Sequence, residues 1–141
     1  MRALNAVKDN LAKNEANYQQ IKTLFNKAKT LTLKEAEGEA GREFVVIARA
    51  NDELKKALNT DTNEVRLSAW TIRSHIERDK ITPFDYSIVK FMDKFYKTQA
   101  GSEGESVVNF YYLGIYYRAV FKKTDKNEIY LQSLVASDDR I

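Results

Sequence analysis

The sequence predicts an α+β fold in which N-terminal helices precede a small, mainly antiparallel twisted sheet with a C-terminal β-meander. Two patterns predict this fold. In the first part of the chain, apolar residues recur at steps of three and four, which is the spacing of a helix. From Val107 onward, runs of β-branched and aromatic residues alternate with short turn segments, which is typical of consecutive antiparallel strands.

The composition narrows the class of protein. A chain of 141 residues can bury one hydrophobic core, and 43% hydrophobic with 30% charged residues is typical of a folded protein. The chain contains no cysteine, which excludes disulfides, cysteine-based zinc sites and thiol nucleophiles. The start, "MRALNAVKDN", lacks the apolar region of a signal peptide, and no run approaches the roughly 20 apolar residues of a membrane span. We therefore expect a cytoplasmic protein with no membrane partner.

The opening segment predicts a long helix with one apolar stripe. The stripe has a period of 3.5 residues and consists of Leu4, Val7, Leu11, Asn14, Tyr18, Ile21, Phe25 and Ala28. Its one polar member, Asn14, is the type of residue that fixes the register of a helix pair. We interpret the stripe as packing on the chain's own domain; the alternative is a helix for self-association or protein docking.

The segment "TLTLKEAEGEAG", residues 30–41, is interpreted as the helix end and a linker, because it combines two glycines with alternating glutamates. Residues 1–40 are thus expected to form a helical segment and linker, and residues 41–141 an α+β domain. That domain opens with a β-branched run of strand length, residues 42–50. Asn51 or Asp52 then caps a short helix.

Two more helices are expected before the meander. Ser68 caps one from Ala69 to about Arg78, directly after a short strand at residues 65–67. Thr82 caps the next, with Pro83 in its first turn, where a missing N–H costs nothing. The apolar face of this helix is expected to contain Ile88, Phe91, Met92 and Phe95, and "QAGSEGES" is expected to follow as a loop.

The meander is expected to contain strands at residues 107–113, 115–123 and 128–135, with turns at Gly114 and "TDKN". Pairing Lys123 with Ile129 gives the last hairpin an apolar core face, because successive side chains alternate between faces. That face contains Tyr117, Ala119, Phe121, Ile129, Leu131, Ser133 and Val135. The other face is aromatic and cationic, which suits phosphates and bases, and contains Tyr116, Arg118, Val120, Lys122, Tyr130 and Gln132.

The net charge of +3 is unevenly distributed. Residues 65–124 hold ten cations and six acids, a net charge of +4, whereas residues 125–141 hold two cations and four acids. A solvated lysine-rich face accounts for such an excess as well as a nucleic-acid ligand does. Charge alone therefore does not identify the partner.

The chain lacks the sequence motifs of several kinds of functional site. The chain has neither GxxxxGK[ST] nor GxGxxG, and "HIE" at residues 75–77 lacks the cysteines of a zinc deaminase. One histidine cannot form a His-rich metal site, so we expect no metal and no cofactor. Judged by spacing alone, His75 is an ordinary helix residue, Trp70 belongs to the core, and Thr71 and Ser74 lie on the helix surface.

Two stretches resemble a known family: "VRLSAWTIRSHIERDKITPFDYSIVKFMDKFY" and, after a loop, "YYRAVFKKTDKNEIYLQSLVAS". Their order is similar to that of phage-borne nucleases of the barnase/EndoU/colicin/RelE-like (BECR) superfamily. The shared pattern is a strand ending in leucine-serine, a helix with a histidine, a second helix, and a meander whose Tyr/Arg strand ends in lysine. The resemblance covers roughly residues 64–137.

Carried over to this chain, the resemblance implies catalytic roles for His75, Arg118, Lys122 and Ser133. It implies substrate contacts from Tyr117, Thr124 and either Lys122 or Lys123, with Tyr116 or Tyr130 stacking on a base. Lys122 is favoured over Lys123 because the hairpin register places Lys122 on the open face. The same register places Ser133 on the core face, in conflict with the resemblance.

The chemistry implied by the resemblance is metal-independent cleavage of RNA by a toxin-like or phage accessory ribonuclease. A base takes the proton of the 2′-hydroxyl, whose oxygen attacks the adjacent phosphorus, and an acid protonates the leaving 5′-oxygen. His75 suits the base or the acid, and Arg118 and Lys122 suit the phosphate. The alternatives are a non-catalytic phage or mobile-element protein that keeps the fold for interaction, and an RNA-binding protein that does not cleave.

Overall fold

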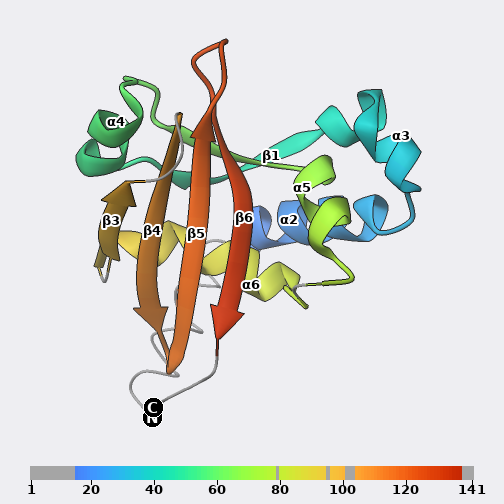
Figure 1. Ribbon diagram of the computed structural model, residues 1–141. Helices are drawn as coiled ribbons and strands as arrows, with labels where there is room; N and C mark the ends of the chain where they lie inside the picture. The colour runs from blue at the N-terminus through green and yellow to red at the C-terminus, as the bar shows by residue number, and fades with distance from the viewer. Residues whose placement is uncertain (1–14, 79, 95, 101–103, 138–141) are drawn as a thin grey trace.

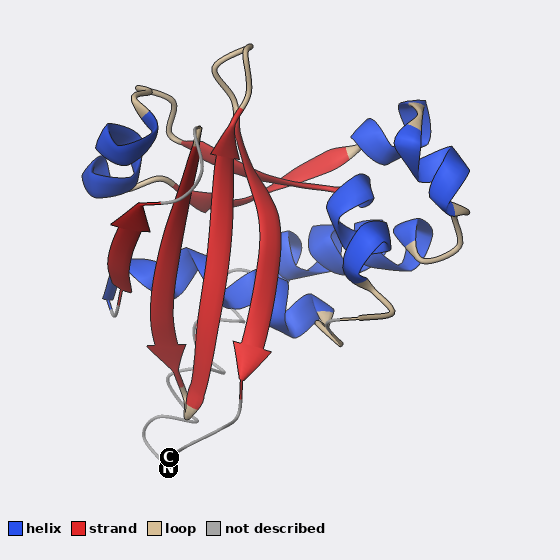
Figure 2. Cartoon of the chain, viewed as in Figure 1, coloured by secondary structure: helices blue, strands red, loops and turns tan. Residues whose placement is uncertain are grey.

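The computed structural model describes residues 15–78, 80–94, 96–100 and 104–137 (Figures 1 and 2). The α-helices are α2 (Glu15–Ala28), α3 (Leu33–Glu37), α4 (Asp52–Leu58), α5 (Ala69–His75) and α6 (Pro83–Ser87), with 3₁₀ helices η1 (Glu39–Arg42) and η2 (Ile88–Lys94). The strands are β1 (Phe44–Arg49), β2 (Glu64–Ser68), β3 (Tyr96–Ala100), β4 (Glu105–Tyr112), β5 (Ile115–Lys123) and β6 (Ile129–Ser137). The predicted α+β class is confirmed.

The strands form one six-stranded sheet in the order β1-β2-β6-β5-β4-β3. Every neighbouring pair is antiparallel except β2 and β6, which run parallel. In Figure 1, η2 and α6 lie behind strands β4 to β6, α2 extends to the right of β6, and no described helix covers the face of these strands that is turned to the viewer. Within the described part of the chain, no helix has the length and apolar character needed to cross a membrane.

Helix α2 shares one hydrophobic core with the rest of the described chain. Its buried residues Ile21, Leu24 and Ala28 belong to the same cluster as Leu67 and Phe121 of the sheet. The expectation that the stripe packs on the chain's own domain is therefore confirmed for Ile21, Phe25 and Ala28. Its first four residues, Leu4 to Asn14, lie outside the described residues. The described residues on both sides of position 40 therefore contribute to the same hydrophobic core.

The linker expected at residues 30–41 is wrong, because this segment is folded. Thr32 caps α3 with a reciprocal capping box that involves Glu35. Gly41 is buried, and a Cβ on it would lie 1.7 Å from the main-chain oxygen of Ala36, so η1 packs directly on α3. Arg73 fixes the segment to α5 by donating from Nε to the main-chain oxygen of Leu31 at 2.6 Å. Local capping and close backbone packing thus outweigh the low helix propensity of glycine.

The third helix is much shorter than expected. Thr82 caps it and Pro83 occupies its first turn as expected, but α6 ends at Ser87 and a 3₁₀ helix follows. Tyr96 to Ala100 then form strand β3, which pairs with Ser106 to Phe110 of β4. Pairing with β4 gives hydrogen-bond partners to backbone N–H and C=O groups that the end of an isolated helix leaves unsatisfied. The spacing of apolar residues within the segment does not predict this pairing. Of the expected apolar face, Ile88 and Met92 are buried, Phe91 is half-buried, and Phe95 lies outside the described residues.

The last hairpin begins in the expected register and then shifts. Lys123 pairs with Ile129 and Phe121 with Leu131, as expected, but Val120 pairs with Ser133. Gln132 is therefore the extra residue of a β-bulge, and a bulge reverses the faces of the residues beyond it. Ser133 and Val135, both expected on the core face, lie on the open face instead. The bulge removes the conflict between the register and the resemblance at Ser133.

Candidate functional site

A groove of about 530 Å³ lies between α5 and the β5–β6 hairpin. Four of the residues implied by the resemblance line it: His75, Lys122, Thr124 and Tyr130. They come from a helix, two strands and a turn that are separated by up to 55 positions in the sequence (His75 to Tyr130). The fold therefore assembles an imidazole, an ammonium group and a phenol at one surface.

Side chains of α5 position the groove by bonding to the edge of β6. The parallel pairing of β2 with β6 extends only to Arg66 and Tyr130. Beyond this point, Thr71 donates from Oγ1 to the main-chain oxygen of Leu131 at 3.0 Å. Nε2 of His75 lies 3.2 Å from the main-chain oxygen of Gln132, the bulged residue. Helix α5 thus replaces a neighbouring strand along this part of β6.

The hydrogen bonds of His75 define its tautomer. Nε2 faces a carbonyl oxygen, which can only accept, and Nδ1 faces Nη2 of Arg78, which can only donate. In the tautomer that fits both partners, Nε2 donates and Nδ1 accepts. Both ring nitrogens are engaged by protein groups. Proton exchange with a substrate at Nδ1 requires the exposed Arg78 side chain to move aside.

Lys122, near the end of β5, and Thr124, directly after it, have different roles. Lys122 is exposed on the open face, opposite Tyr130 on β6 and Glu105 on β4. The hydroxyl of Thr124 accepts from the main-chain N–H groups of Lys126 at 3.3 Å and Glu128 at 3.2 Å. Thr124 thus holds the β5–β6 turn, and Lys122 supplies the positive charge.

Tyr130 is held by an aromatic and cationic cluster. The Arg66 guanidinium lies 4.2 Å from the Phe44 ring centroid and 6.0 Å from that of Tyr130, and it forms a 2.6 Å ion pair with Glu128. Burial alone lowers the pKa of Arg66, but the Tyr130 hydrogen bond and the Glu128 charge raise it above its usual value. A fixed ring at Tyr130 suits stacking on a planar ligand.

The remaining open-face residues lie away from the groove. Arg118 is exposed and precedes Lys122 by four positions, which places it about 13 Å away along the strand. Tyr116 is 51% exposed and packs against Tyr111 with 4.7 Å between ring centroids. Ser133 is half-buried opposite Val120. These three residues do not line the groove, so Arg118 and Lys122 cannot contact one phosphate as a compact pair.

Two residues with implied substrate contacts, Tyr117 and Lys123, bond to other parts of the fold. Tyr117 is 2% exposed and stacks on Phe110 with 5.1 Å between centroids. Its hydroxyl donates to Oδ1 of Asp85 at 2.7 Å, and burial, followed by this hydrogen bond, raises its pKa. Lys123 donates from Nζ to the main-chain oxygen of Asn59 at 3.1 Å. Both lie on the core side of β5, as the register predicts.

Seven further residues line the groove and were not candidate site residues: Ser68, Trp70, Thr71, Ser74, Arg78, Leu131 and Gln132. Trp70 was expected in the core but is 40% exposed, whereas Thr71, expected on the surface, is buried. Ala69 and Ile72 are both fully packed, and that three-residue spacing already turns Trp70 away from the core. The bulge at Gln132 has no signal in the sequence.

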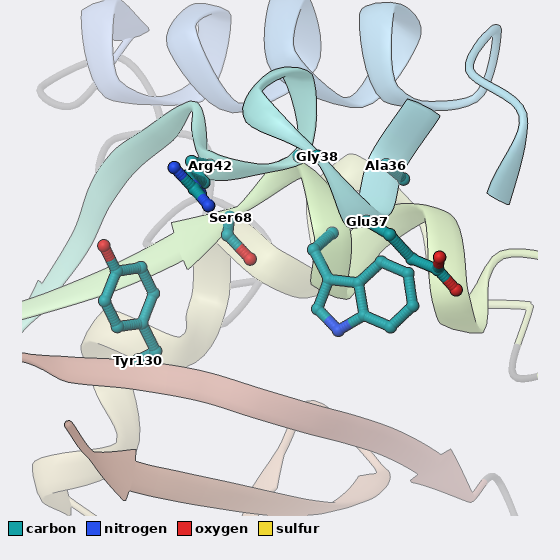
Figure 3. A pocket seen from close by; sticks show the side chains of 8 residues that line it. Ala36, Glu37, Gly38, Arg42, Ser68 and Tyr130 are labelled. Carbon is teal, nitrogen blue, oxygen red and sulfur yellow. The ribbon is translucent and has the colours of Figure 1, made fainter. Parts of the chain in front are cut away.

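A second pocket of about 410 Å³ adjoins the groove and shares Ser68, Trp70 and Tyr130 with it. Its far side is formed by α3 and η1. Figure 3 shows Arg42 and Ser68 on the side of Tyr130 and Glu37 at the opposite end. Among the residues that line the two pockets, Arg42, Arg78 and Lys122 are cationic and Glu37 is acidic. The combined surface is therefore positive.

No group of three or more His, Cys, Asp or Glu side chains in the described ranges is placed to hold a metal ion. No protein-family model, no curated protein and no solved structure matches the chain. The function is therefore argued from the geometry of the groove.

Proposed function

We propose that the chain is a cytoplasmic, metal-independent endoribonuclease, toxin-like or of phage accessory type, whose active site is the groove between α5 and the β5–β6 hairpin. One observation carries the proposal. The groove unites His75, the only histidine, with Lys122 and Arg78 and with the aromatic ring of Tyr130. An acid–base group, two cations and a stacking surface are the parts that RNA cleavage without a metal requires.

The proposed reaction is attack of a 2′-oxygen on the adjacent phosphorus. As the O2′–P bond forms and the P–O5′ bond breaks, the 2′-hydroxyl proton passes to Nδ1 of His75, and the 5′-oxygen takes a proton from the imidazolium or from water. Lys122 and Arg78 stabilise the added negative charge on the phosphoryl oxygens. The products carry a 2′,3′-cyclic phosphate and a 5′-hydroxyl.

The contact between His75 and Arg78 has a place in this mechanism. A guanidinium group binds phosphate in a charge-assisted, often bidentate manner that is stronger than its single bond to an imidazole nitrogen. Arg78 therefore moves from Nδ1 of His75 to the bound phosphate, and the base is exposed only when substrate is present. The carbonyl of Gln132 keeps the ring oriented throughout.

The test is incubation of the full chain with structured and single-stranded RNA in the presence of a chelator. We expect cleavage that persists in the chelator and leaves 2′,3′-cyclic phosphate ends. Lys122→Ala should reduce the rate, whereas Lys123→Ala, its neighbour on the core side of the same strand, should not. Cleavage that disappears with the chelator, or products with 5′-phosphate ends, would contradict the proposed mechanism.

A second candidate is RNA binding without cleavage by a phage or mobile-element interaction protein. The observation that favours it is that both ring nitrogens of His75 bond to protein groups. Such a protein would bind RNA in the groove, and His75→Ala would leave its affinity unchanged. The absence of cleavage together with salt-dependent binding would favour this candidate over the first.

A further inference from the structure

The pocket beside the groove has a rigid wall. Helix α3 and η1 are fixed by the Thr32 capping box and by the contact of Gly41 with Ala36. Lys27 of α2 pairs with Glu43, directly after η1, at 2.8 Å. A wall held at several points keeps its shape when a ligand enters, which lowers the cost of binding. The volume of about 410 Å³ lies within the roughly 300–1,000 Å³ that is common for small-ligand sites.

The pocket also has an aromatic surface. Trp70 borders it and is 40% exposed, although tryptophan is highly buried on average in folded proteins. Tyr130 borders the pocket as well, and its ring is held by Phe44 and Arg66. Exposed rings beside a positively charged groove are the typical stacking surface for unpaired bases.

The polar groups of the pocket suit the edge of a base. Glu37 is exposed and offers carboxylate acceptors, and Arg42 is exposed and offers guanidinium donors. Figure 3 places the two side chains at opposite ends of the pocket. A flat ligand between them meets an acceptor at one end and a donor at the other, and nucleobases carry both donors and acceptors on their edges.

We infer that this pocket binds one unpaired nucleobase of single-stranded RNA, next to the phosphate that the groove holds. That the ligand is RNA rests on the proposed function. The two cavities share Trp70, Tyr130 and Ser68, so a base in the pocket and a phosphate beside His75 belong to adjoining nucleotides. A base within a duplex is stacked and paired, and cannot enter. The substrate class is therefore single-stranded RNA or an unpaired loop.

Trp70 is the only tryptophan of the chain, so tryptophan fluorescence reports on the surface where this pocket meets the groove. The full chain is titrated with a short 2′-O-methyl oligoribonucleotide, which binds like RNA but has no free 2′-hydroxyl for attack. We expect the fluorescence to change on saturation with the single strand. The change should be small with the same sequence as a duplex and with an abasic strand of equal charge. A mononucleotide that binds as tightly as the oligonucleotide would overturn the assignment to RNA.

Affinity is measured separately, by the anisotropy of a labelled single strand, for variants of two exposed aromatic residues. Trp70→Ala should weaken binding about 5- to 150-fold, because one stacked base contributes about 1–3 kcal/mol. Trp70→Phe should retain most of the affinity, and Tyr111→Ala, at a residue that is 42% exposed and borders neither pocket, should bind as the wild type does. Circular dichroism confirms that each variant is folded.

The outcomes separate this inference from the proposed ribonuclease activity. A fluorescence change and a Trp70-dependent affinity without cleavage would support the base pocket and contradict the enzyme. Cleavage with unchanged Trp70 fluorescence, or with equal affinity of Trp70→Ala and Tyr111→Ala, would support the enzyme and overturn the pocket. Absence of binding to any single strand at low salt would overturn both.

Discussion

Nε2 of His75 lies 3.2 Å from the main-chain oxygen of Gln132, the bulged residue of β6. Thr71, one turn earlier in α5, donates to the preceding carbonyl, that of Leu131. The helix therefore occupies the edge of β6 where the pairing with β2 has ended. The candidate acid–base residue is held by the same contact that closes the sheet, so its effects on stability and on activity need separate measurement.

The buried Thr71 contact should contribute more to stability than the partly exposed His75 contact. Thr71→Val leaves the oxygen of Leu131 without its donor, and we expect a loss of about 1–3 kcal/mol in the free energy of unfolding. His75→Ala should cost about 0.5–1.5 kcal/mol. Urea denaturation gives both values. Thr23→Val, on the exposed side of α2, is the control. Equal stability of Thr71→Val and this control would show that α5 does not secure β6.

Substitutions of Gly41 and Gly38 test the packing of the wall of the base pocket, with Gly38 as the control. A Cβ on Gly41 would lie 1.7 Å from the oxygen of Ala36, whereas one on Gly38 would lie 3.6 Å from its nearest neighbour. Gly41→Ala should therefore destabilise the protein by about 1–3 kcal/mol, and Gly38→Ala should be tolerated. Thermal unfolding distinguishes them. A Gly41→Ala protein with the wild-type melting temperature would contradict the close packing of η1 on α3.

The hydrogen bond from Tyr117 to Asp85 should make stability fall at alkaline pH. The pKa of Tyr117 is raised in the folded protein, first by burial and then by the bond to Asp85. Its contribution to stability is therefore complete below about pH 10, the ordinary tyrosine pKa, and is lost as the pH rises above that value. The stability difference between the wild type and Tyr117→Phe should shrink from pH 9 to pH 11. A difference that stays constant over this range would contradict the prediction. Tyr116→Phe removes an exposed hydroxyl and serves as the control.

Salt dependence should separate the two lysines at the end of β5. Lys122 is exposed beside the groove, whereas Lys123 bonds to Asn59 on the core side. Lys122→Gln should reduce the slope of log affinity against log salt by about 0.7 for single-stranded RNA, and Lys123→Gln should leave it unchanged. Arg118→Gln should reduce the slope by a similar amount if the strand extends over the open face. Equal slopes for all three variants would show that RNA does not follow this surface.

The sequence predicted the parts of the fold that depend on local patterns. The caps at Ser68 and Thr82, the turn at Gly114 and the pairing of Lys123 with Ile129 were each predicted from residue type and spacing, and the structure confirms them. His75, Lys122, Thr124 and Tyr130 line one groove.

Two of the errors, at strand β3 and at the bulge of β6, come from long-range contacts. Strand β3 exists because β4 has an edge to pair with, and the bulge at Gln132 arises where α5 replaces β2 beside β6. The base pocket depends on the packing of Gly41 against Ala36, and a glycine in the sequence does not by itself predict such a contact. Trp70 was placed in the core by residue type alone, although its neighbours Ala69 and Ile72 already occupy the inward face of α5.

The rate of RNA cleavage by His75→Ala, compared with the wild type in the presence of a chelator, tests the central claim most directly. If His75 transfers a proton in the groove, the rate should fall by about 10²–10⁴-fold while circular dichroism and RNA affinity remain unchanged. Ser74→Ala, one position earlier in the same helix, should cleave at nearly the wild-type rate. Equal cleavage by His75→Ala, or a wild-type protein that cleaves no RNA, would contradict the assignment of the groove as a ribonuclease active site.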